Sequence, residues 1–87
     1  MPQPEAIPLN IIARAPFDIY FEGKANALSA RNRIGDFDIL PGHADFFSML
    51  SPGEVTIEPS EGDTVSFPVK SGIVTVKGNE VFVFVNV

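Results

Sequence analysis

The C-terminal stretch Gly72-Ile73-Val74-Thr75-Val76-Lys77-Gly78-Asn79-Glu80-Val81-Phe82-Val83-Phe84-Val85 decides the fold class. β-Branched and aromatic residues dominate both halves of it, and such residues pack well on a pleated surface. Between the halves, Lys77-Gly78-Asn79-Glu80 contains the Gly and Asn that readily adopt the positive φ of a tight turn. The stretch therefore predicts a β-hairpin with strands at 72–77 and 80–87.

The run from Val81 to Val85 is apolar at every position, so both faces of this strand are apolar. Such a strand is either central and covered on both sides, or an edge strand that another protein covers. In 54–58, by contrast, Val55 and Ile57 alternate with polar residues, which is the pattern of a half-buried strand. The sequence leaves the two interpretations of 81–85 open, and the second bears on function.

Further short apolar runs precede this hairpin, and turn signals rich in Pro, Gly, Asn and Asp separate them. No helical pattern exceeds about eight residues, although 43–50 fits one helical turn as well as an irregular strand. The remaining expected strands are 9–14, 17–22, 24–31, 34–40, 54–58 and 63–69. Strands this short and numerous predict an all-β fold, a two-sheet β-sandwich or flattened barrel of about 8–10 strands.

Length and composition predict one small folded domain. The chain has 87 residues, of which 45% are hydrophobic, enough apolar material for a single core. Pro2, Pro4 and Pro8 fix extended geometry near the N-terminus. We therefore expect a flexible Pro-rich leader at 1–8 and a β-sandwich domain at 9–87.

Charge and composition exclude several function classes. The formal net charge is −5, and an acidic surface repels phosphate backbones, so nucleic acid is not an expected partner. The chain has no Cys, which excludes a disulfide framework and a thiolate site. No apolar run approaches the roughly 20 residues of a spanning helix, and the N-terminus lacks signal-peptide features. We expect a cytoplasmic chain without membrane insertion.

The sequence offers little for catalysis or metal binding. His43 is the only histidine, and no serine, Ser48 included, lies in a nucleophile-elbow sequence. The densest group of metal-ligating residue types is Asp36, Asp38, His43 and Asp45, whose spacing matches no known metal loop. The glycines are isolated, so no phosphate loop exists. We expect no catalytic residue, metal, cofactor or direct small-molecule substrate.

Proline and glycine positions predict turns. Pro41 with Gly42, and Pro52 with Gly53, form turn dipeptides, and Gly72 follows Ser71 at a strand boundary. We interpret these five residues as structural, because Gly supplies positive φ or close packing and Pro fixes φ.

The segment Gly35-Asp36-Phe37-Asp38-Ile39-Leu40-Pro41-Gly42-His43-Ala44 resembles the Gly-acid-x-Gly-Ile-Leu-Pro-Gly-His-Ala motif of epsilon subunits of F-type ATP synthases, called delta in mitochondria. The resemblance continues at Leu50-Ser51-Pro52-Gly53 and at Ser71-Gly72-Ile73-Val74-Thr75-Val76, and it covers nearly all of 9–87. The chain departs from the family pattern at several positions, which are Asp38 for Gly, Asp45 for Pro, Phe46 and Phe47 for a Leu pair, Ile34 for an acid, and Lys70-Ser71-Gly72 for Ser-Gly-Gly.

The resemblance implies a non-catalytic rotor subunit of the central stalk. Such a subunit links the gamma subunit to the membrane rotor ring and transmits rotation for ATP synthesis, as a peripheral protein at the cytoplasmic face of the bacterial inner membrane. Family members commonly continue into a C-terminal helical hairpin that inhibits ATP hydrolysis. The chain ends at Val87, so we expect the β-sandwich domain without that hairpin.

The resemblance also implies which residues face partners. Gly35 and Asp36 would face the rotor ring, where the Asp36 carboxylate would meet arginines. His43, Ala44, Phe46 and Phe47 would lie toward gamma, although one of the two phenylalanines is expected in the core, because neighbouring strand residues point to opposite faces. His43 is equally explained as a turn residue that bonds to local backbone. The alternative function is a free-standing β-sandwich binding module of unknown ligand, but one Tyr and no Trp argue against carbohydrate binding.

Overall fold

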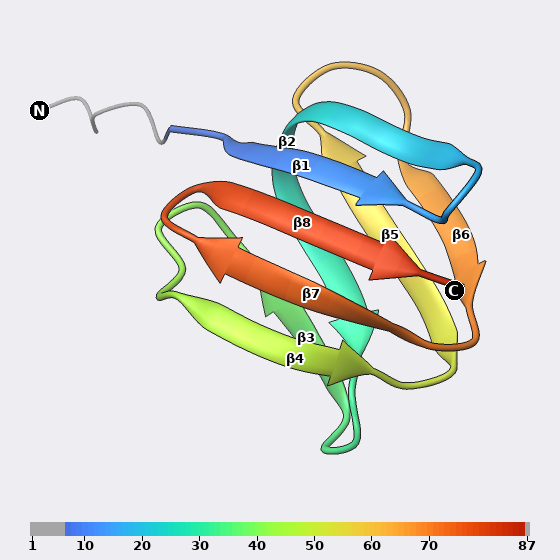
Figure 1. The fold of residues 1–87 in the computed structure, drawn as a ribbon. Coiled ribbons are helices and arrows are strands. Elements are labelled where there is room, and N and C mark those ends of the chain that lie inside the picture. The colour runs from blue at the N-terminus through green and yellow to red at the C-terminus, as the bar shows by residue number, and fades with distance from the viewer. Residues whose placement is uncertain (1–6, 87) are drawn as a thin grey trace, which may run out of the picture.

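The computed structural model describes residues 7–86, which form an all-β fold without helix (Figure 1). It confirms the expected fold class and number of strands. The eight strands are β1 Leu9–Arg14, β2 Ile19–Arg31, β3 Asp36–Ile39, β4 Phe46–Leu50, β5 Gly53–Pro59, β6 Val65–Val69, β7 Gly72–Lys77 and β8 Glu80–Val85. Residues 1–6 of the expected leader lie outside the described residues, and Ile7 and Pro8 precede the first strand.

The structure corrects one detail of the expected strand pattern and settles another. The expected strands 17–22 and 24–31 are one strand, β2, because Gly23 pairs with Ile11 of β1 and the ladder continues through it. The expected interruption at Gly23, between the strands 17–22 and 24–31, is therefore not a turn. The undecided segment 43–50 contains strand β4, which pairs antiparallel with β7.

The strands form one curled sheet whose two halves face each other. The hydrogen-bonded order is β4-β7-β8-β1-β2-β5-β6, and β3 pairs with β2 beside this path. β2 belongs to both halves: its first part pairs with β1 and its second part with β3 and β5, with an irregularity between Ala25 and Ala27. In Figure 1, β4, β7, β8 and β1 form one layer, and β3, β5, β6 and the second part of β2 form the other.

The core lies between the two layers and is entirely apolar among the described residues. Alternate residues of each strand point into it, as the period of two requires. Its members come from all eight strands: Leu9, Ile11, Ala13, Ala25, Leu28, Ala30, Ile39, Leu50, Val55, Ile57, Phe67, Val69, Val74, Val76, Val81, Val83 and Val85. The stacked rings of Tyr20 and Phe67, with centroids 4.4 Å apart, add to this packing.

Gly72 is required at the start of β7. A Cβ at this position would lie 2.6 Å from the carbonyl oxygen of Phe84 and 2.7 Å from a methyl group of Val85. These distances are shorter than any van der Waals contact allows, so only Gly lets β7 and β8 approach here. The expected structural role of Gly72 thus comes from close packing.

Candidate functional site

The outer surface of β4, β7, β8 and β1 is apolar and exposed. Each strand contributes every second side chain, and the strand register aligns them in two rows. One row runs Phe47–Thr75–Phe82–Ile12 and the other Met49–Ile73–Phe84, with Arg14 beside Phe84. We call Ile12, Phe47, Met49, Ile73, Phe82 and Phe84 the outer apolar face.

Exposure of this face is large for apolar side chains in a sheet. Phe47 and Met49 are 63% and 69% exposed, and Phe82 and Ile12 are 40% and 38% exposed. The rings of Phe82 and Phe84 stack with centroids 6.1 Å apart. β8 lies between β7 and β1, so the edge-strand interpretation of 81–85 is wrong. The strand is central, but its outer face is open within the described chain, so it is not covered on both sides either.

The β3–β4 loop lies at one end of this face and is held by the β7–β8 turn. The backbone N–H of Gly42 donates to the Asn79 side-chain oxygen at 3.2 Å, and that of Gly78 donates to the Asp45 carboxylate at 2.9 Å. These bonds connect segments more than thirty residues apart in sequence, so they fix the loop on the body. Pro41 and Gly42 form the turn itself, where Gly42 has a φ of 84°.

The structure separates the four residues expected to face gamma. Phe47 belongs to the outer apolar face, whereas Phe46 points inward, half-buried against the core and 5.4 Å from the ring of Phe37. His43 is half-buried with its ring edge toward Phe46, and its Nδ1 lies 2.7 Å from the Ala44 carbonyl oxygen. A carbonyl oxygen can only accept, so Nδ1 carries the hydrogen in this contact. Ala44 is exposed.

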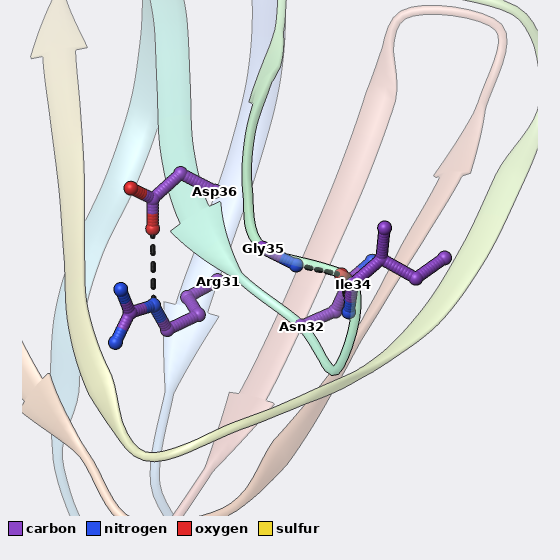
Figure 2. Close-up of polar contacts among 5 residues, drawn as sticks. All are labelled: Arg31, Asn32, Ile34, Gly35 and Asp36. Carbon is purple, nitrogen blue, oxygen red and sulfur yellow. Dashed lines mark hydrogen bonds and ion pairs between the residues drawn. The ribbon is translucent and has the colours of Figure 1, made fainter.

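The β2–β3 hairpin carries the two residues expected to face the rotor ring. It extends beyond the rest of the body (Figure 1). Arg31 and Asp36 are paired across the two strands, and the Arg31 Nε donates to the Asp36 carboxylate at 3.1 Å (Figure 2). Asn32 and Gly35 close the turn with two backbone hydrogen bonds of 3.0 and 3.2 Å. Gly35 has a φ of 145°, in the region that favours glycine.

The candidate metal ligands have separate partners. Asp36 pairs with Arg31, Asp38 accepts from the Ser29 hydroxyl at 2.6 Å, and Asp45 accepts from Gly78. No group of three or more His, Asp or Glu side chains lies close enough to hold a metal ion within residues 7–86. Ser48 donates to the Met49 carbonyl and accepts from Asn32, so its hydroxyl has no bond to His43.

Pro52 and Gly53 lie where β5 begins, with Pro52 in a bend and Gly53 as the first residue of the strand. Reasoning from sequence identified Phe47 but not most of the outer apolar face, since Ile12, Met49 and Ile73 lie on different strands. The usable signal was the doubly apolar run 81–85, to which the strand order adds its neighbours. Across the described strands and loops, no helix is long and apolar enough to cross a membrane.

Comparison with known proteins identifies the family. The family described as "ATP synthase, Delta/Epsilon chain, beta-sandwich domain" matches residues 8–87. The ATP synthase epsilon chain of Wolinella succinogenes is 36% identical over 72 residues, covering 83% of this chain and 53% of that one. Those of Micrococcus luteus and Streptomyces avermitilis are each 35% identical, over 72% and 69% of this chain and 69% and 48% of theirs.

Solved structures share the fold. A chain of the Euglena gracilis mitochondrial ATP synthase structure has a TM-score of 0.81 at 17% identity, covering 98% of this chain and 59% of that one. A chain of the Tetrahymena thermophila mitochondrial ATP synthase central stalk and c-ring structure has a TM-score of 0.78 at 19% identity, covering 94% and 66%. The chain spans about half the length of several curated relatives, and through its β-sandwich it belongs to the ATP synthase delta/epsilon chain family.

Proposed function

We propose that this chain is a non-catalytic central-stalk subunit of a proton-translocating F-type ATP synthase. In this role the outer apolar face docks on the gamma subunit, and the β2–β3 hairpin with Gly35 and Asp36 faces the membrane rotor ring. The chain links the two and passes rotation between them during ATP synthesis. As part of the complex it is peripheral, at the cytoplasmic face of the bacterial inner membrane.

The observation that supports gamma docking is the pair of apolar rows across four neighbouring strands. A contiguous exposed apolar patch marks an interaction site more often than scattered apolar residues do. Covering the exposed 40% of Phe82 would contribute roughly 1 kcal/mol from apolar burial alone. Six such side chains in one face supply the apolar centre that a stable interface needs.

The β3–β4 loop supports the same surface. Phe47 follows this loop directly, and the bonds from Gly42 and Gly78 hold the loop against the β7–β8 turn. His43 and Ala44 therefore lie on a fixed segment next to the outer apolar face. In the proposed assembly they contact gamma at the rim of the face, while Phe46 supports the loop from inside through its ring contact with His43.

The stiffness of the body also suits a part that passes on rotation. Both layers share β2, and the apolar core between them contains no buried polar side chain among the described residues. Close-packed interiors have low compressibility. A load applied at the hairpin is therefore carried to the outer apolar face with little internal deformation.

A binding experiment with the cognate gamma subunit tests the proposal. The wild-type chain is expected to form a stable one-to-one complex, and Phe47→Glu is expected to lose it while keeping its far-UV spectrum and its midpoint of thermal unfolding. Phe47 suits this test better than Phe46, because Phe46 packs on the core and its replacement by Glu would disturb the fold.

Ser66→Glu is the matched control, since Ser66 is exposed on the outer surface of β6 in the other layer. This variant is expected to bind gamma like the wild type. Absence of gamma binding by well-folded wild-type protein at micromolar concentration would overturn the proposed function. Equal losses for Phe47→Glu and Ser66→Glu would overturn the assignment of the docking face.

A further inference from the structure

The tip of the β2–β3 hairpin has a charge opposite to that of the chain. The chain has six cationic residues and a net charge of −5, yet two of the six, Arg31 and Arg33, lie within three residues of each other. With Asp36 as the only acid in 31–36, this segment has an excess of positive charge. The hairpin therefore presents a locally cationic end on an acidic protein.

The carboxylate of Asp36 already has a cationic partner. Arg31 and Asp36 face each other across the strand pair, and their side chains form the only ion pair found within residues 7–86. Both side chains are largely exposed, so the pair contributes little to stability. It nevertheless balances the charge of Asp36 within the hairpin, and a partner arginine would have to compete with Arg31.

The side chains of Arg33 and Ile34 at the turn are exposed and, unlike that of Asp36, form no ion pair within residues 7–86. Arg33 is exposed and has no carboxylate oxygen within 4 Å among the described residues. Ile34 is 96% exposed, the highest value for a large apolar side chain in the described chain. Figure 2 shows its side chain on the far side of the hairpin from the Arg31–Asp36 pair. A cation and an aliphatic group thus stand together at the tip.

The turn that presents them is held rigidly. The Asn32 side-chain oxygen accepts from the backbone N–H groups of Ile34 and Gly35 at 2.9 and 3.2 Å. The Asn32 amide also donates to the Ser48 hydroxyl of β4 at 3.2 Å, which ties the hairpin to the other layer. Binding through a preorganised turn costs little ordering entropy, so exposed groups here are well suited to recognition.

A groove connects the tip with the outer apolar face. It has a volume of about 390 Å³ and is lined by Asn32, Arg33, Ile34, Ser48 and Met49. Met49 is also a member of the outer apolar face, so the two surfaces proposed for gamma and for the ring are continuous. The groove offers aliphatic walls together with an amide, a hydroxyl and a guanidinium group.

We propose that the β2–β3 hairpin binds the rotor ring through Arg33 and Ile34, and that the ring loop it meets presents a carboxylate beside an apolar recess. The inference rests on the proposed function, which places this hairpin against the ring. Ile34 enters the recess and Arg33 pairs with the carboxylate, a charge-assisted contact. Asp36 acts within the hairpin, through Arg31, and does not pair with a ring arginine.

The test measures binding of the complex between this chain and gamma to purified rotor ring in detergent. Arg33→Glu and Ile34→Asp are each expected to weaken ring binding by at least about 10-fold, as loss of a central apolar or charged contact does. Asp36→Asn is expected to change it by less than about 3-fold, because it removes a pair that is internal to the hairpin. Changing the acid of the ring loop to Lys is expected to restore binding of Arg33→Glu.

Two control variants match the exposure and charge of the changed residues. Phe17 is 95% exposed at the β1–β2 turn, so Phe17→Asp controls for Ile34→Asp, and Lys24→Glu controls for the charge reversal at Arg33. Both are expected to leave ring binding unchanged. All variants are first required to bind gamma like the wild type.

Three outcomes would overturn the inference. A severe loss with Asp36→Asn and none with Arg33→Glu would show that the acid carries the contact. Unchanged ring binding for every hairpin variant, with gamma binding intact, would show that the hairpin does not touch the ring, and the gamma part of the proposed function would stand. Failure of the wild-type chain to bind gamma would instead refute the proposed function itself, and the inference with it.

Discussion

The outer surface of β4, β7, β8 and β1 is apolar, whereas the outer surface of β3, β2, β5 and β6 is polar. On the first, one register row reads Phe47–Thr75–Phe82–Ile12. On the second, the row reads Asp38–Ser29–Thr56–Ser66, and hydrogen bonds of 2.6 and 3.2 Å join Asp38 to Ser29 and Thr56 to Ser66. The inner faces of both layers are equally apolar.

This difference distinguishes apolar side chains that form the core from apolar side chains that lie outside it. A two-layer fold needs one apolar face on each layer, and the second layer has no more than that. The first layer has apolar side chains on both faces, and the outer ones add nothing to the core. In the proposed function, these outer side chains form the surface that gamma covers.

The largest expected effect comes from a charge in the middle of the apolar row. Phe82→Lys is expected to weaken gamma binding by about 100-fold or more, because aromatic residues near the centre of an interface carry much of its binding energy. Thr56→Lys occupies the matching place in the polar layer and is expected to bind like the wild type. Titration calorimetry measures both, and equal affinities would remove the distinction between the two faces.

A methyl group at Gly72 tests the close packing of β7 against β8, the two strands in the middle of the outer apolar face. Gly72→Ala places a Cβ against Phe84 and Val85, so the free energy of unfolding is expected to fall by about 2 kcal/mol, as for other overpacked sites.

Gly53 starts a strand of the other layer and serves as the control for Gly72. A Cβ there meets Arg31 at an ordinary 3.7 Å, so Gly53→Ala is expected to stay within about 0.5 kcal/mol of the wild type. Urea unfolding measures both variants. Equal stability of the two would contradict the close approach of β7 and β8.

The polar row is expected to matter for stability and not for gamma binding. Ser29→Ala removes the hydrogen bond to Asp38 and is expected to lower the free energy of unfolding by about 1 kcal/mol. Ser29→Thr keeps the hydroxyl and should retain most of that stability. Gamma affinity is expected to be unchanged in both, and a drop in affinity would mean that the polar face also contacts gamma.

The smallest expected effect is on the stability of the free chain when the apolar face is made polar. Phe47→Ser is expected to change the free energy of unfolding by less than about 0.5 kcal/mol, because Phe47 is mostly exposed on an edge strand. Phe46→Ser, its inward-pointing neighbour, is expected to cost about 2 kcal/mol or more. Thermal unfolding separates the two, and a reversed order would mean that the orientations of the two rings are exchanged.

Sequence periodicity was sufficient for the fold class and for most strands, because a period of two and turn residues are local signals. It was insufficient at Gly23, since a glycine inside a bent strand has the same local signature as one in a turn. The segment containing Phe46 and Phe47 stayed undecided for a different reason. It forms a strand by pairing with β7, whose residues lie up to about thirty positions away in the sequence.

The candidate site was only partly predictable. The resemblance pointed to His43, Phe47 and the hairpin, but the outer apolar face joins strands from both ends of the chain, and no local pattern reports their order. The pairing of Asp36 with Arg31 likewise depends on the register of β2 with β3. Both features require three-dimensional contacts that single-sequence patterns do not encode.

The parallel pairing of β1 with β8 has a consequence for the order of folding. All other strand pairs of the described chain are antiparallel, whereas this one joins residues 10–14 to residues 80–84. During synthesis, β1 has its second neighbour only after β8 has left the ribosome, so the layer with the apolar face forms last. Proteins dominated by such distant contacts fold slowly. The outer apolar face is thus completed only when β8 pairs with β1, after the chain has supplied every described strand of the other layer.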